Sequence, residues 1–192
     1  MAAQKTHKLT HVVGIGASAG GLIALEEFFK TVPNRTGLAY VVIQHLPADH
    51  KSMMSELLSR HTELIVTYIE DNMLLEADTV YLIPPGFNVK LFHGRFILTR
   101  GETESRQLNL PIDIFFSSLA EDQEDRAIAI ILSGTGSDGS RGIRHIKEKF
   151  GITIVQDLET AQFDGMPKSA VQTGIIDFIL PPEKMIHHIL AY

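Results

Sequence analysis

Short apolar runs alternate with amphipathic segments along the chain. The apolar runs predict strands at residues 11–16, 38–43, 64–69, 79–83, 127–132, 152–155 and 175–179. The amphipathic segments predict helices at 20–31, 50–60, 112–123, 139–149 and 182–190. The run 127–132 is apolar on both faces, as a central parallel strand requires. The alternation therefore predicts an α/β fold: a doubly wound, mainly parallel sheet with helices on both faces.

One segment departs from this alternation. Residues 88–99 predict a small antiparallel hairpin that turns at His93-Gly94, and residues 100–111 predict an exposed loop. Residues 1–11 read as a polar tail, and residues 12–192 as a single domain. A chain of 192 residues is long enough for one sizeable core.

Composition narrows the function classes. The chain has no cysteine, which excludes disulfides, thiolate metal sites and a cysteine nucleophile. A net charge of −6 argues against nucleic acid as a partner. The tail lacks the apolar core of a signal peptide, and no apolar run is long enough to span a bilayer. We expect a cytoplasmic protein with no membrane insertion.

The stretch from Gly14 to Gly21 follows an apolar run and precedes a predicted helix. It contains a Gly-x-Ser-x-Gly core formed by Gly16, Ser18 and Gly20. A serine at such a strand-to-helix turn exposes its hydroxyl near helix N–H groups that stabilise negative charge. Ser18 is therefore a candidate nucleophile, although a serine at this position could also simply cap the helix.

The same glycines allow a dinucleotide-binding interpretation. Gly14-x-Gly16-x-x-Ala19 fits the dinucleotide fingerprint, which tolerates alanine at its third position. That fingerprint needs an acid at the end of the second strand, where this chain has Gln44-His45. The missing acid weakens the nucleotide interpretation.

Three polar residues follow predicted strands of the sheet. Ser18 follows the first, His45 the second and Asp138 the central one, so all three fall at the carboxyl edge where ligands bind. A hydroxyl nucleophile, its general base and an orienting carboxylate are the members of a catalytic triad. The alternatives are a structural or solvated His45 and a helix-capping Asp138.

Metal-dependent hydrolysis would need a different pattern. His45 and His50 are five apart, His187 and His188 are adjacent, and no His-Glu-x-x-His sequence occurs. We therefore expect no metal site.

Four motifs, taken in order, resemble the catalytic domain of CheB-type chemotaxis methylesterases. They are residues 13–21, 44–47, 132–139 and 156–170, and the likeness runs from about Val12 to Leu190. The resemblance implies a serine esterase that hydrolyses glutamate γ-methyl esters on chemoreceptors or related signalling proteins and releases methanol. Some members of the family also deamidate receptor glutamines. The implied partner is a methyl-accepting chemotaxis receptor or a similar methylated protein, and no cofactor is implied.

Site roles follow from the same resemblance. Ser18 corresponds to the nucleophile, His45 to the base and Asp138 to the orienting acid. Backbone N–H groups of Ala19 and Thr135 are the expected oxyanion hole. A loop containing Met166 and Pro167 is expected to line the substrate site.

Two departures from the family pattern affect these expectations. The family often has Ser-Thr-Gly-Gly at the nucleophile, and this chain has Ser18-Ala19-Gly20-Gly21, which retains only the backbone donor. The family's N-terminal receiver domain is also missing, so we expect activity independent of phosphodonors, or a place in a longer protein such as a fusion with a methyltransferase domain. The alternative function is a non-catalytic signalling module that binds methylated receptor helices or a partner domain.

Overall fold

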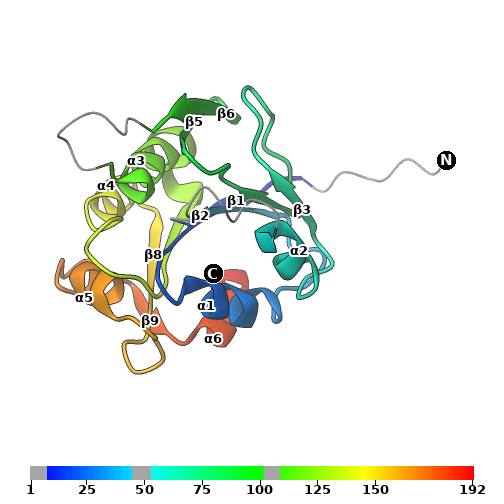
Figure 1. The fold of residues 1–192 in the computed structure, drawn as a ribbon. Helices are drawn as coiled ribbons and strands as arrows, with labels where there is room; N and C mark the ends of the chain where they lie inside the picture. The colour runs from blue at the N-terminus through cyan, green and yellow to red at the C-terminus, as the bar shows by residue number, and fades with distance from the viewer. Residues whose placement is uncertain (1–7, 45–52, 102–108) are drawn as a thin grey trace.

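A seven-stranded parallel sheet forms the centre of the molecule (Figure 1). The computed structural model describes residues 8–44, 53–101 and 109–192. The strand order is β3-β4-β2-β1-β7-β8-β9. The strands are β1 (His11–Ala17), β2 (Leu38–Gln44), β3 (Ile65–Tyr68), β4 (Thr79–Leu82), β7 (Ala127–Ile131), β8 (Ile152–Gln156) and β9 (Phe178–Leu180).

The strand order changes direction between β1 and β7. From β1 the chain first builds β2, β3 and β4 on one side, and later adds β7, β8 and β9 on the other. Loops that follow the two strands at such a reversal diverge and leave a crevice at the carboxyl edge. The predicted doubly wound fold is confirmed, and its expected ligand site lies after β1 and β7.

Helices cover both faces of the sheet. One face packs against α1 (Gly21–Phe29), α2 (Met53–Ser59) and α6 (Pro182–Ala191). The other packs against α3 (Pro111–Gln123), α4 (Gly142–Glu148) and α5 (Gly165–Val171). Figure 1 shows α1 beside α6, and α3 beside α4, in agreement with their contacts. No helix within the described ranges is long and apolar enough to cross a lipid bilayer.

The glycines of β1 allow α3 to lie close to the sheet. A Cβ on Gly14 would lie 2.9 Å from Cε1 of Phe116, and one on Gly16 would lie 2.6 Å from Cγ2 of Ile112. Real Cβ atoms are not found this close to their neighbours, so both positions require glycine. The Gly-x-Gly spacing that suggested a dinucleotide site is thus explained by helix packing.

The predicted hairpin is present as β5 (Phe87–Phe92) and β6 (Arg95–Arg100). His93 and Gly94 connect the strands with φ values of 49° and 71°. Two positive φ values are the signature of a type I′ turn, which matches the twist of paired strands. The hairpin packs on α3, where the amide of Leu91 donates to Oγ of Ser118 at 3.0 Å. Most of the predicted loop 100–111 lies outside the described residues.

The structure differs from the prediction at two elements. The last strand begins at Phe178 rather than at residue 175, because Ile175 and Ile176 pack against the core on the α3 side instead of pairing with β8. The segment 165–171 is the helix α5, which the pattern did not predict. Pro167 lies in its first turn, where a proline removes no helical hydrogen bond.

Candidate active site

Ser18 and Asp138 lie on the two loops at the reversal of strand order. Ser18 directly follows β1, and Asp138 lies in the loop after the adjacent strand β7. His45 lies outside the described residues. Its neighbour Gln44 pairs with Ala17, the residue that precedes Ser18. In this register β1 and β2 end level with each other at the carboxyl edge of the sheet, one residue before Ser18 and His45 in the sequence.

The backbone at Ser18 is held on both sides. Its amide donates to the carbonyl of Ser133 at 3.0 Å, and its carbonyl accepts from the amide of Gly21 at 2.9 Å. The N-cap of α1 is Gly20, whose φ of 70° favours glycine, and no side chain caps this helix. Ser18 therefore does not cap α1. Within the described part of the chain its hydroxyl makes no hydrogen bond, so it is available for chemistry.

Asp138 binds the first turn of α3. Its Oδ2 accepts from the amide of Ile112 at 3.0 Å, and its Oδ1 accepts from the amide of Asp113 at 2.9 Å. The side chain is only 4% exposed. Asp138 does not cap the helix that follows it in sequence, because the N-cap of α4 is Arg141.

This arrangement suits an orienting carboxylate. The positive end of α3 favours a negative charge at Asp138, and two backbone donors fix the plane of its carboxyl group. Each carboxylate oxygen has a second lone pair, so a ring N–H could still be accepted.

Asp113 makes the converse contacts. This side chain, which lies in the first turn of α3, accepts from the amides of Arg141 and Gly142 at 3.0 and 2.8 Å. Burial raises the pKa of Asp113, the hydrogen bond from Gly142 lowers it, and the nearby charge of Asp138 raises it again. The segments that carry the two aspartates are thus locked together. Sequence reasoning missed Asp113, whose one signal was an acid just after a helix-starting proline.

The expected oxyanion donors have no competing partners. Within the described residues the amides of Ala19 and Thr135 donate to no acceptor. The residue between Ser133 and Thr135 is tied down: the amide of Gly134 donates to the carbonyl of Phe163 at 2.9 Å. Both N–H groups are therefore available to a developing negative charge.

Met166 and Pro167, which are expected to line the substrate site, lie in the first turn of the helix α5, and both are buried. The amide of Met166 donates to the carbonyl of Gly134 at 2.8 Å. A Cβ on Gly134 would collide with Sδ of Met166 and lie 2.9 Å from Cβ of Ser18. Met166 thus packs against Gly134, in the loop that contacts Ser18.

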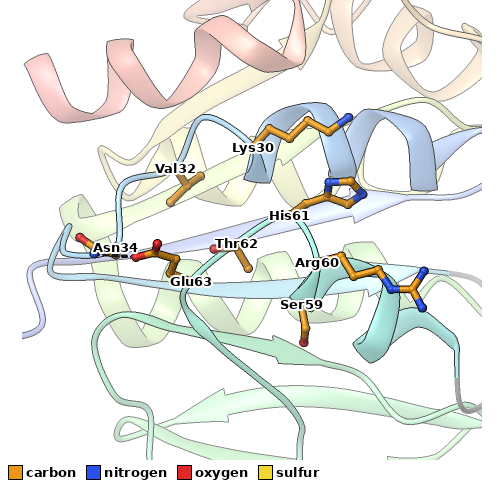
Figure 2. A pocket seen from close by; sticks show the side chains of 8 residues that line it. All are labelled: Lys30, Val32, Asn34, Ser59, Arg60, His61, Thr62 and Glu63. Atoms are coloured by element: carbon orange, nitrogen blue, oxygen red, sulfur yellow. Dashed lines mark hydrogen bonds between the residues drawn. The ribbon is translucent and has the colours of Figure 1, made fainter.

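A cavity of about 460 Å³ lies at the other edge of the sheet (Figure 2). Its lining residues belong to the segments that lead into β2 and β3: Lys30, Val32, Asn34, Ser59, Arg60, His61, Thr62 and Glu63. Figure 2 shows Asn34 and Glu63 together at one end, where Nδ2 donates to Oε2 at 2.8 Å. This cavity is remote from Ser18. No group of three or more His, Asp or Glu side chains that could hold a metal ion occurs in the described ranges.

The comparisons with known proteins identify the family of the chain. The family described as CheB methylesterase matches residues 13–189, so the chain belongs to the CheB methylesterase family. The crystal structure of the Thermotoga maritima CheB methylesterase catalytic domain superimposes with a TM-score of 0.84 at 29% identity, and covers 94% of this chain and 97% of that one.

Two sequence relatives are longer than this chain. A Geobacter sulfurreducens protein-glutamate methylesterase/protein-glutamine glutaminase 1 is 34% identical over 176 residues, which are 89% of this chain and 49% of that protein. An uncharacterized 104.1 kDa protein of Rhodobacter capsulatus is 48% identical over 132 residues, 69% of this chain and 14% of that protein. The chain thus spans half or less of these two relatives.

Proposed function

We propose that this chain is a serine esterase that hydrolyses glutamate γ-methyl esters on a chemoreceptor or a related methylated signalling protein. The observation that carries the proposal is the placement of Ser18. Ser18 lies at the reversal of strand order, and its hydroxyl makes no hydrogen bond to the described residues. The amides of Ala19 and Thr135, which are the expected oxyanion donors, donate to no acceptor among these residues either. Membership of the CheB methylesterase family supports the reaction class.

In the proposed first half-reaction, Ser18 Oγ attacks the ester carbonyl carbon while His45 accepts its proton. The carbonyl oxygen becomes negative and is stabilised by the amides of Ala19 and Thr135. The bond to the methoxy group then breaks, and the leaving oxygen takes the proton from His45 and departs as methanol. Asp138 orients the imidazole and stabilises its charged form.

In the second half-reaction, water attacks the acyl group on Ser18 while His45 accepts a proton from it. The bond to Ser18 breaks, Oγ recovers the proton from His45, and the substrate is released with a glutamate side chain. A glutamine amide would follow the same route and release ammonia. The second activity in the name of the Geobacter relative favours testing this reaction as well.

The test is methanol release from a methylated receptor fragment. Ser18→Ala and His45→Ala are expected to abolish activity to a similar degree, because members of a triad act as a unit. Asp138→Asn is expected to lower kcat by about 10⁴-fold. Ser59→Ala is the control, since the Oγ of this exposed serine donates to the carbonyl of Ser55 within α2 at 2.7 Å and makes no other hydrogen bond to the described residues.

Two outcomes would contradict the proposal. A folded Ser18→Ala variant with the activity of the parent would show that Ser18 is not the nucleophile. Binding of the methylated fragment without methanol release by the parent chain would instead support a non-catalytic signalling module.

A further inference from the structure

Ser133 connects three loops at the carboxyl edge of the sheet. This residue follows β7 and is 1% exposed. Its carbonyl accepts from the amide of Ser18 at 3.0 Å, and its hydroxyl donates to the carbonyl of Ala19 at 2.9 Å. The same hydroxyl accepts from the amide of Phe163 at 3.0 Å, and the carbonyl of Phe163 is a second, more distant acceptor for it at 3.3 Å. Its own amide donates to Oε1 of Gln156 at 2.8 Å.

Two hydrogen bonds join Ser133 to the turn at Ser18 and Ala19, and they lie on either side of the reacting groups along the chain. The first bond holds the amide of Ser18, and the second holds the carbonyl of Ala19. Between these two atoms along the chain lie Oγ of Ser18 and the amide of Ala19. The other expected oxyanion donor, the amide of Thr135, is two residues beyond Ser133 on the same loop. Ser133 therefore contacts the segment that carries the nucleophile and one expected donor on both sides, and it lies two residues before the other donor.

Gln156 fixes Ser133 in turn. It is the last residue of β8, is 1% exposed, and donates from Nε2 to Oγ1 of Thr160 at 3.3 Å. A buried amide such as that of Ser133 needs an acceptor, and a glutamine held at its other end supplies one in a fixed place. The loop carrying Ser133 is thereby anchored to the neighbouring strand.

We propose that Ser133 is a positioning residue for the esterase reaction, with Gln156 as its support. The role deepens the proposed function and rests on Ser18 being the nucleophile. The hydroxyl of Ser133 holds the carbonyl of Ala19, which belongs to the peptide unit that follows the Ala19 amide, and so restricts the rotation at Ala19 that would turn this amide away from the oxygen on which negative charge develops. Because a misplacement of about 1 Å in an active site can cost on the order of 100-fold in rate, losing this hydroxyl lowers kcat.

The experiment compares Ser133→Ala with Thr153→Val. Thr153 is a fully buried hydroxyl in β8 whose Oγ1 donates to the carbonyl of Ile175 at 3.0 Å, away from the nucleophile turn. Active sites are counted by complete reaction with a fluorophosphonate, and kcat for methanol release is expressed per labelled site. Ser133→Ala is expected to lower this kcat by about 10- to 100-fold with KM unchanged. Thr153→Val is expected to lower the midpoint of thermal unfolding without changing kcat per site.

A second pair of variants controls for the change in side-chain volume. Ser133→Thr and Ser133→Val add the same bulk at a buried position, and only threonine keeps the hydroxyl. The threonine variant is expected to retain at least tenfold more kcat per labelled site than the valine variant. A structural contribution would instead lower the labelled fraction equally in both.

The outcomes separate this role from the nucleophile assignment. If Ser18→Ala is inactive and Ser133→Ala keeps the parent kcat per site, Ser133 has no positioning role and the nucleophile stands. If Ser18→Ala keeps activity, the proposed function itself fails. If Ser133→Ala does not fold, equal kcat per labelled site in the threonine and valine variants overturns the inference.

Discussion

Replacing Gly16 by alanine tests how closely α3 is held against β1. A Cβ at residue 16 would lie 2.6, 3.0 and 3.3 Å from Cγ2, Cδ1 and Cγ1 of Ile112, so its three nearest contacts all belong to one side chain. Overpacking of this kind typically destabilises by about 1–3 kcal/mol. We expect a loss of free energy of unfolding in this range for Gly16→Ala.

The conflict predicts a specific rescue. Ile112 is fully buried, so Ile112→Ala alone should cost about 2–5 kcal/mol. In the double variant the new methyl group occupies part of the space that Ile112 leaves. The double variant should therefore be more stable than the sum of the single losses, by about 0.5–3 kcal/mol. The measurement is urea unfolding of all four proteins with a common m-value.

Gly14→Ala is the matched control. A Cβ at residue 14 would face Phe116, Leu119 and Phe115 instead of Ile112. Ile112→Ala should therefore not rescue it. Additivity within about 0.5 kcal/mol for Gly16→Ala with Ile112→Ala would refute the reasoning, as would equal rescue of both glycine variants.

Three further predictions follow from other parts of the molecule. Folding raises the pKa of Asp113, so the contribution of this group to stability is complete below its ordinary pKa of 3.8 and is lost as pH rises through its pKa in the folded protein. The free energy of unfolding of the parent relative to Asp113→Asn should therefore fall as pH rises. A difference in urea unfolding that does not change with pH would contradict this. Asp78→Ala should cost about 1–3 kcal/mol and leave kcat unchanged, since Oδ1 of Asp78 accepts from the amides of Thr36 and Gly37 at 2.7 and 2.9 Å, at the edge away from Ser18. Acetyl phosphate should leave methanol release by the purified 192-residue chain unchanged, and an increase would reveal a regulatory site.

Much of the fold could be predicted because each strand has a local signal. The buried runs at β1, β2 and β7 are continuous and apolar, so their positions followed from the sequence within a residue or two. The helix α5 could not be predicted, because it is short and contains Pro167. The start of β9 was misplaced because Ile175 and Ile176 are apolar for packing and not for strand pairing.

The candidate site could be assembled from the sequence as a set of residue types but not as a set of contacts. Ser18 and Asp138 followed from their positions after strands, and parallel strands bring such residues to one edge. The bonds from Asp138 to the first turn of α3 join residues 25 and 26 positions apart, which no local pattern reveals. The hydroxyl of Ser133 bonds to Ala19, 114 residues away, and is equally invisible in the sequence.

The most direct test of the central claim is to map the serine that becomes covalently modified. The chain is allowed to react with a fluorophosphonate and then digested, and the modified residue is located by peptide mass spectrometry while methanol release is followed in parallel. The account predicts one phosphonate per chain, on Ser18, with loss of methanol release in proportion to labelling. Loss of activity with the label on another serine, or full activity with Ser18 completely modified, would contradict it.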